Sequence, residues 1–168
     1  MKNIIIILFI LINLFSCSKE KLTKETQKGA NTFSCKIDGK VFKPSESGGL
    51  FGSPPITVYN YSYHGFTLVA SFSETENGEI PKDIIINLPY LKEKGLYDLG
   101  LNPHAIFRYS YAYGPEYYTN NTYTGQVNIT RCDTINNIYS GTFFFKAIND
   151  STGKVVSITD GRFDVKGQ

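Results

Sequence analysis

Apolar and polar residues alternate in short segments through most of this chain, and Gly, Pro, Asn and Asp separate those segments. Alternation with a period of two is typical of β-strands that bury one face, and no long segment repeats apolar residues at helical spacing. The pattern predicts a hairpin at residues 32–43 and further strands at residues 56–63, 66–73, 84–88, 95–100, 105–113, 123–131, 140–148, 154–159 and 163–165. Residues 44–55, 74–82 and 114–121 are predicted loops.

Turn chemistry fixes the register of the first hairpin. Asp38-Gly39 stands between two alternating segments. This dipeptide accepts the positive φ values that a two-residue type I′ turn needs. We therefore expect Ile37 to face Lys40 and Cys35 to face Phe42.

The last hairpin has an apolar face and a face of unknown exposure. Phe143, Phe145 and Ala147 point to one side of its first strand and should be core residues, whereas Phe144 points to the other side. Asp160-Gly161 is expected to form a turn before the final short strand.

Many short strands with turn residues between them predict an all-β fold, formed by residues 32–168 as a single domain. We expect an antiparallel β-sandwich or a partly closed β-barrel of about eight to ten strands. One sequence does not decide between these two closures.

Residues 1–16 have the pattern of a bacterial lipoprotein signal peptide. Lys2 precedes the apolar residues 4–12, which are too few to cross a bilayer as a helix of about 20 residues. Leu14, the small Ser16 and Cys17 then stand in the register of a lipobox, although Phe15 is bulkier than usual. We expect the Cys17 thiol to carry diacylglycerol and fatty acids such as palmitate. The alternatives are an ordinary signal peptide with a chance cysteine and a plain membrane anchor.

The polar residues 17–31 are predicted to be the lipidated cysteine and a flexible tether. They lack an apolar pattern, and a coil of this length spans roughly 20 Å. The protein would then be lipid-anchored in the cell envelope, on the periplasmic face or the cell surface.

Composition argues against nucleic acid as a partner. Lys and Arg number 17 against 15 Asp and Glu, so the net charge is small. The chain has 12 Tyr and 12 Phe but no Trp, and residues that favour strands dominate its body.

Four segments resemble a known group of proteins: residues 95–100, 125–130, 140–145 and 153–163, which include the sequences Ser-Gly-Thr-Phe and Thr-Asp-Gly-Arg-Phe. They are similar to small Bacteroidota envelope lipoproteins that carry a β-rich domain of unknown function. The resemblance covers roughly residues 32–165. It implies a β-rich envelope lipoprotein and brings no catalytic residues.

Few residues are candidates for a disulfide, a metal site or catalysis. Cys35 and Cys132 are a candidate disulfide if the chain is exported, with two separate thiols as the alternative. His64 and His104 lack the spacing of a zinc site, and the acidic cluster of Glu74, Glu76 and Glu79 is better explained as a solvated turn. We expect no metal, no cofactor and no enzyme activity.

Tyrosines at every second position are the least ordinary feature. Tyr109, Tyr111 and Tyr113 share one strand face and could form a platform for a glycan or an apolar ligand. The alternative is cross-strand packing, which we favour for Tyr109 and Tyr111. The sequence thus predicts a lipid-anchored, non-catalytic interaction or structural module that meets an unknown envelope protein or glycan. The alternative is a ligand-binding lipoprotein that uses its tyrosine-rich faces.

Overall fold

The structure is a computed structural model that describes residues 21–45, 54–61, 65–72, 80–89, 91–109 and 114–167. The leader with Cys17 lies outside these residues, and so do Tyr111 and Tyr113. The described part of the chain contains no helix that could cross a membrane.

The described residues form strands and no helix. Their bounds in chain order are β1 (Thr32–Ile37), β2 (Lys40–Phe42), β3 (Ile56–Tyr61), β4 (Gly65–Phe72), β5 (Lys82–Leu88), β6 (Gly95–Leu99), β7 (His104–Tyr109), β8 (Glu116–Tyr118), β9 (Gly125–Asp133), β10 (Ile138–Ile148) and β11 (Val155–Lys166). The three-residue strand β8 lies inside a segment that we predicted to be a loop.

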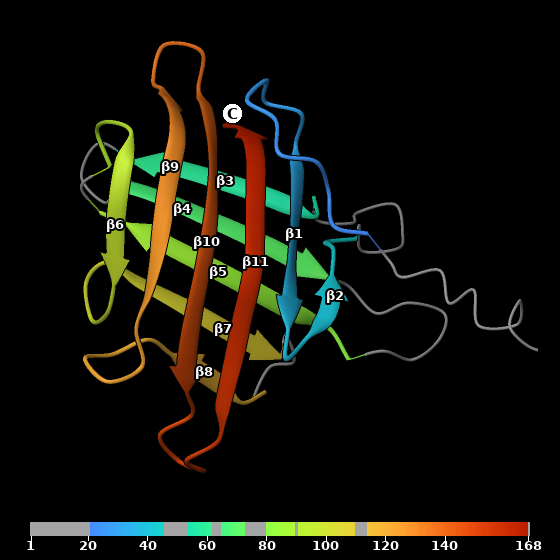
Figure 1. Ribbon diagram of the computed structural model, residues 1–168, viewed down its shortest axis with the longest axis vertical. Helices are drawn as coiled ribbons and strands as arrows, with labels where there is room; N and C mark the ends of the chain where they lie inside the picture. Colours follow the sequence, from blue (N-terminus) through green and yellow to red (C-terminus); the bar gives the residue numbers. More distant parts are fainter. Residues whose placement is uncertain are drawn as a thin grey trace, which may run out of the picture.

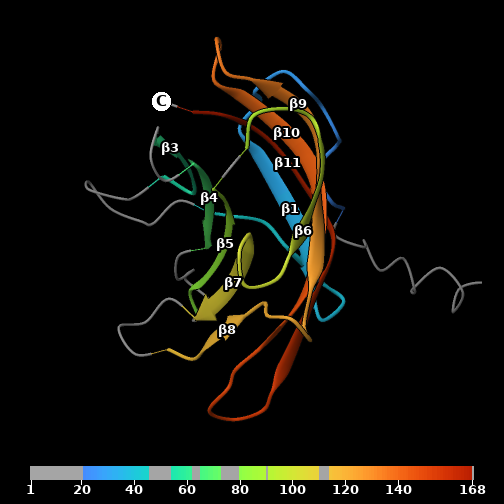
Figure 2. The same ribbon diagram turned by 90° about the vertical axis from the view of Figure 1, so that its left-hand side faces the viewer.

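These strands belong to one antiparallel sheet of eleven strands, in the order β2-β1-β11-β10-β8-β7-β5-β4-β3, with β9 and β6 continuing from β10. The sheet is open and strongly curled, like half of a barrel. Its front half (β6, β9, β10, β11, β1 and β2) crosses its back half (β3, β4, β5, β7 and β8), as Figures 1 and 2 show. The all-β antiparallel prediction is confirmed, and the closure is nearer to the partly closed barrel than to two separate sheets.

The hydrophobic core fills the space between the two halves. The Phe66 ring of the back half lies 4.8 Å from the Tyr139 ring of the front half, measured between ring centroids. Burying this apolar surface is the main force that keeps the two halves of the curled sheet packed against each other. The largest fully buried side chains are Tyr139, Phe33, Phe66, Phe107, Phe145, Leu68, Ile84, Ile86, Leu88, Leu99, Ile129 and Ile158.

The first hairpin has the predicted register. Ile37 pairs with Lys40, and Cys35 pairs with Phe42. Asp38 and Gly39 have φ values of 47° and 83°, as a type I′ turn requires. The local pattern was sufficient here because the turn residues and the alternation agree.

The final hairpin confirms one prediction and corrects another. Phe143 and Phe145 are 3% and 1% exposed, whereas Phe144 on the opposite face is 54% exposed. Asp160-Gly161, however, is not a turn between strands but lies within the continuous strand β11.

A β-bulge explains why a turn signal stands inside a strand. Phe143 pairs with Gly161 and Phe145 with Ile158, so two residues of β11 stand opposite Phe144. Asp160 takes a positive φ of 52°, and a Cβ on Gly161 would lie 2.5 Å from the Phe143 ring. Asp and Gly tolerate the positive φ and the close approach that this bulge requires, as they do in a turn.

Candidate functional site: the N-terminal strap and the outer-face groove

Residues 21–31, which we call the N-terminal strap, lie against the outer face of the front half. Thr23 bonds to the Ser34 hydroxyl through both its amide and its hydroxyl, at 2.9 and 2.8 Å. At the other end, Asn31 accepts a bond from the Lys166 amide at 2.9 Å. The tether prediction for this described segment was therefore wrong, because polar residues of the sheet bind a segment that has no apolar pattern of its own.

Asp164 is the centre of these contacts. Its carboxylate is buried and accepts bonds from the amides of Lys28 at 3.0 Å, Gly29 at 2.8 Å and Ala30 at 3.2 Å. The hydroxyls of Thr26 and Ser140 also donate to it. A buried carboxylate is stable only when such donors satisfy it.

The same donors set the protonation state of Asp164. Burial raises the pKa of its carboxyl, but bonds from Thr26, Lys28, Ser140 and Gly29 outweigh burial and lower the pKa to about 2. Asp164 is therefore ionised at neutral pH, where its bonds to the strap are charge-assisted.

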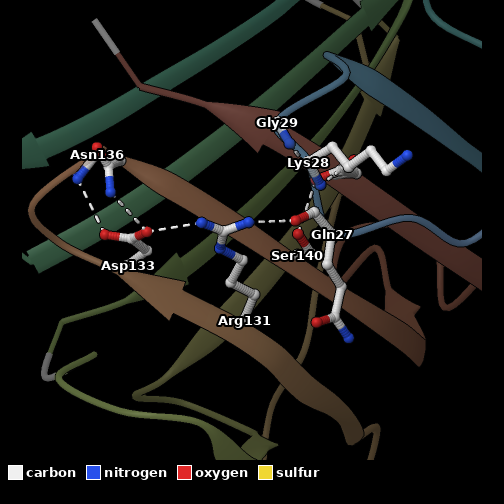
Figure 3. Close-up of polar contacts among 8 residues, drawn as sticks. Gln27, Lys28, Gly29, Arg131, Asp133, Asn136 and Ser140 are labelled. Carbon is white, nitrogen blue, oxygen red and sulfur yellow. Dashed lines mark hydrogen bonds and ion pairs between the residues drawn. The ribbon is translucent and has the colours of Figure 1, made fainter.

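Two arginines of the sheet also hold the strap. Figure 3 shows Arg131 between the Gln27 carbonyl and the Asp133 carboxylate; its Nη2 lies 2.7 Å from Asp133. Asn136 donates twice to Asp133 and fixes it in turn, and these bonds from Arg131 and Asn136 lower the Asp133 pKa. Arg162 donates to the Thr23 carbonyl at 3.3 Å.

Beside the strap, the outer face is hollowed into a groove of about 410 Å³, which we call the outer-face groove. Two rows of paired residues form it. One row runs across β6, β9, β10 and β11 and consists of Leu96, Asn128, Thr142 and Arg162. The next row contains the paired residues Gln126 and Phe144. Glu25 of the strap also lines the groove. A smaller hollow of about 240 Å³ shares Glu25 and Thr142 and extends toward Gln27 of the strap.

Charged groups at the groove are already paired. The Lys36 ammonium lies 2.9 Å from the Asp160 carboxylate, and its hydrogen bond lowers the pKa of Asp160. Arg162 lies 3.6 Å from the Glu25 carboxylate. The groove therefore offers balanced charge together with neutral polar and apolar side chains.

The tyrosine positions do not form this groove. Tyr109 is half-buried, and its ring packs 5.2 Å from the buried Phe107 ring, against the core. Tyr111 and Tyr113 lie outside the described residues. The ring of Tyr109, the described member of the predicted platform, thus packs against the core.

Both described cysteines are free, so the candidate disulfide is not formed. Cys35 is on β1 and Cys132 on β9, and β11 and β10 lie between these strands. Three strand spacings place them on the order of 14 Å apart, beyond the roughly 7 Å that a bridge spans. Burial raises the pKa of both thiols, most strongly at Cys35.

The remaining chemical candidates stay apart. The described ranges contain no group of three or more His, Cys, Asp or Glu side chains that could hold a metal ion. His104 is half-buried, and burial lowers its pKa. His64, Glu74, Glu76 and Glu79 lie outside the described residues.

Two segments quoted from the sequence above contribute to this site, although their pattern alone does not indicate that role. The segment Thr-Asp-Gly-Arg-Phe supplies Asp160 and Arg162, and Ser-Gly-Thr-Phe supplies Thr142. The exposed Phe144 follows directly. Asp164 was not singled out, because a carboxylate between the apolar Phe163 and Val165 has the pattern of an ordinary solvent-facing strand position.

An all-β domain with a half-barrel sheet and a strapped outer face is therefore the class of protein that the structure defines. A family model for a domain of unknown function, DUF6252, matches residues 31–165, and the chain belongs to this family. No curated protein and no solved structure matches the chain.

Proposed function

We propose that the protein is a lipid-anchored, non-catalytic module of the bacterial cell envelope that binds a partner through its outer face. The observation that carries this proposal is the N-terminal strap. It fixes the segment that follows the expected lipid site against the same face that holds the groove.

The position of the strap sets how far the groove can lie from a membrane. Only six residue steps separate Cys17 from Thr23, the first strap residue bonded to the sheet. At about 3.5 Å for each step, this stretch reaches at most about 20 Å. A partner is therefore expected among components at the membrane surface.

Paired carboxylates support a binding role over a catalytic one. Asp160 bonds to Lys36, which holds the pKa of its carboxyl below the usual range, so it stays ionised and unsuited to act as a general acid. Glu25 lies within ion-pair distance of Arg162. Among the described residues that line the groove, none is a Ser, Cys or His, and the one side-chain hydroxyl is that of Thr142.

The anchor is tested with the Cys17→Ser variant in the native bacterium. The wild type should incorporate a labelled fatty acid and sediment with membranes, and the variant should do neither. Cys132→Ser is the matched control and should behave like the wild type. Unchanged labelling of Cys17→Ser would contradict the anchor.

A second candidate function is the binding of a small ligand. The outer-face groove favours it, because its volume falls within the roughly 300–1,000 Å³ typical of ligand sites. The tyrosine faces that first suggested this function are not needed for it.

A further inference from the structure

The floor of the outer-face groove presents polar groups that the fold leaves unused. Asn128 and Thr142 stand directly opposite each other on β9 and β10. Neither side chain has a hydrogen-bond partner among the residues that the structure describes. Gln126 donates its amide to Asp98 at 3.0 Å, and this bond fixes the amide while its carbonyl oxygen stays available.

These groups are spaced for a small polyhydroxyl compound. Opposite residues of an antiparallel pair have Cβ atoms about 4.5–5.5 Å apart. An amide and a hydroxyl at this spacing offer donors and acceptors to neighbouring hydroxyls of one sugar ring. The strands that carry them lie inside the sheet, so the groups are held rigidly.

Phe144 supplies an apolar surface in the same groove. Its side chain is 54% exposed, although β10 is paired on both sides by β9 and β11. Leu96, two strands away, is 65% exposed. An aromatic ring beside fixed polar groups suits a ligand that has one apolar face and polar edges, as a pyranose has.

The charges argue for a neutral ligand. Arg162 is held by the Thr23 carbonyl and lies near Glu25, and Lys36 is bonded to Asp160. A phosphate or a polyanion would meet two carboxylates here and would need to replace existing ion pairs. The guanidinium still carries donors that a hydroxyl can use without disturbing those pairs.

The backbone argues against an extended peptide. Peptides that add to a sheet gain affinity from main-chain hydrogen bonds at an open edge. Along the groove, β10 is paired with β9 and β11, and β9 is paired with β6 as well. β6, whose Leu96 lines the groove, is paired only with β9 among the described strands, so the open strand edge lies at the margin of the groove. The floor formed by β9, β10 and β11 offers side chains alone.

We propose that the outer-face groove binds a neutral carbohydrate, with one pyranose ring stacked on Phe144 and its hydroxyls bonded to Asn128, Thr142, Gln126 and Arg162. This proposal deepens the proposed function and rests on its claim that the outer face is a binding surface. It does not depend on the lipid anchor.

The test uses the full chain in detergent, titrated with maltohexaose, cellohexaose, xylohexaose and N-acetylglucosamine hexamer by calorimetry and saturation-transfer NMR. At least one of these neutral oligosaccharides should bind more tightly than about 1 mM. Phe144→Ala and Asn128→Ala should each weaken that binding by about tenfold or more, which corresponds to about 1.4 kcal/mol. Phe144→Tyr should keep the affinity, because a tyrosine ring stacks equally well.

Tyr118→Ala is the matched control, because Tyr118 is an exposed aromatic on the back half, 40% exposed. It should leave the affinity unchanged. Circular dichroism should show that each variant is folded as the wild type is. The proposal would be overturned if none of the four oligosaccharides bound, or if Phe144→Ala bound them as tightly as the wild type does. Tighter binding of dextran sulfate than of the neutral oligosaccharides would also overturn it. The labelling of Cys17 would stand in each case, so the two failures are distinguishable.

Discussion

Two adjoining parts of the outer face differ in whether their polar side chains are bonded within the protein. One part, around Ser140 and Asp164, is covered by the N-terminal strap, and its polar groups are bonded. The adjoining part, around Asn128 and Phe144, is open to solvent and keeps unpaired polar groups and an exposed ring.

The difference shows what a polar residue on a sheet face signifies. Where the strap covers the face, the polar side chains hold the chain itself, and their loss should cost stability. Where the face is open, polar side chains contribute little to stability and remain available to a ligand. The core, the covered part and the open part of the front half should therefore respond differently to substitution.

The largest difference in stability is expected between substitutions at two neighbouring residues of β10. Phe145→Ala removes a ring that is 1% exposed and should lower the free energy of unfolding by about 3–5 kcal/mol. Phe144→Ala removes a ring of the open part and should change it by less than about 0.5 kcal/mol. Denaturant unfolding of the two variants measures this directly. Equal losses would show that both faces of β10 are buried.

An intermediate effect is expected at the covered part. Asp164→Asn keeps the shape of the side chain but places an amide donor among donors from Thr26, Gly29 and Ser140. We expect a loss of about 2–3 kcal/mol at pH 7, because bonds to a buried charge are lost. Asp98→Asn, on the exposed part of β6, is the control and should lose less than about 0.5 kcal/mol.

The pH dependence of stability should follow the same residue. The folded pKa of Asp164, about 2, lies below its unfolded value of about 3.9, so its contribution is complete above the unfolded value. This contribution is lost as the pH falls through the folded pKa. Between pH 6 and pH 2 (roughly the range of this titration), the free energy of unfolding should fall more steeply with decreasing pH in the wild type than in Asp164→Asn. Parallel curves would mean that Asp164 does not titrate with folding.

The smallest effect is expected for an ion pair on the open part. Lys36 and Asp160 have side chains that are 39% and 47% exposed. Exposed pairs contribute little because water and salt screen them. Lys36→Ala should therefore change the midpoint of denaturation hardly at all. A large loss would show that this pair supports the β11 bulge.

The sequence was informative wherever a local pattern determines the structure. Alternation and the Asp38-Gly39 turn were enough for the β1–β2 register, and alternation alone placed Phe144 opposite to Phe143 and Phe145. The bulge at Asp160 was misassigned because turns and bulges favour the same residues. The strand β8 was missed because three residues are too short for a periodic pattern.

The strap could not be predicted from local pattern. Its main contact joins Lys28 to Asp164, which are 136 residues apart in the chain. Its polar composition is the same as that of a solvated coil, and only the folded sheet brings its partners together. The groove was missed for a related reason, because strap and sheet form it jointly.

Hydrogen exchange of the strap amides tests the central claim that the strap is part of the fold. In the wild type, the amides of Lys28, Gly29 and Ala30 should be protected, since each donates to the Asp164 carboxylate. In Asp164→Asn this protection should fall sharply while that of β10 persists. Exchange of these three amides at the rate of a free peptide in the wild type would contradict the account.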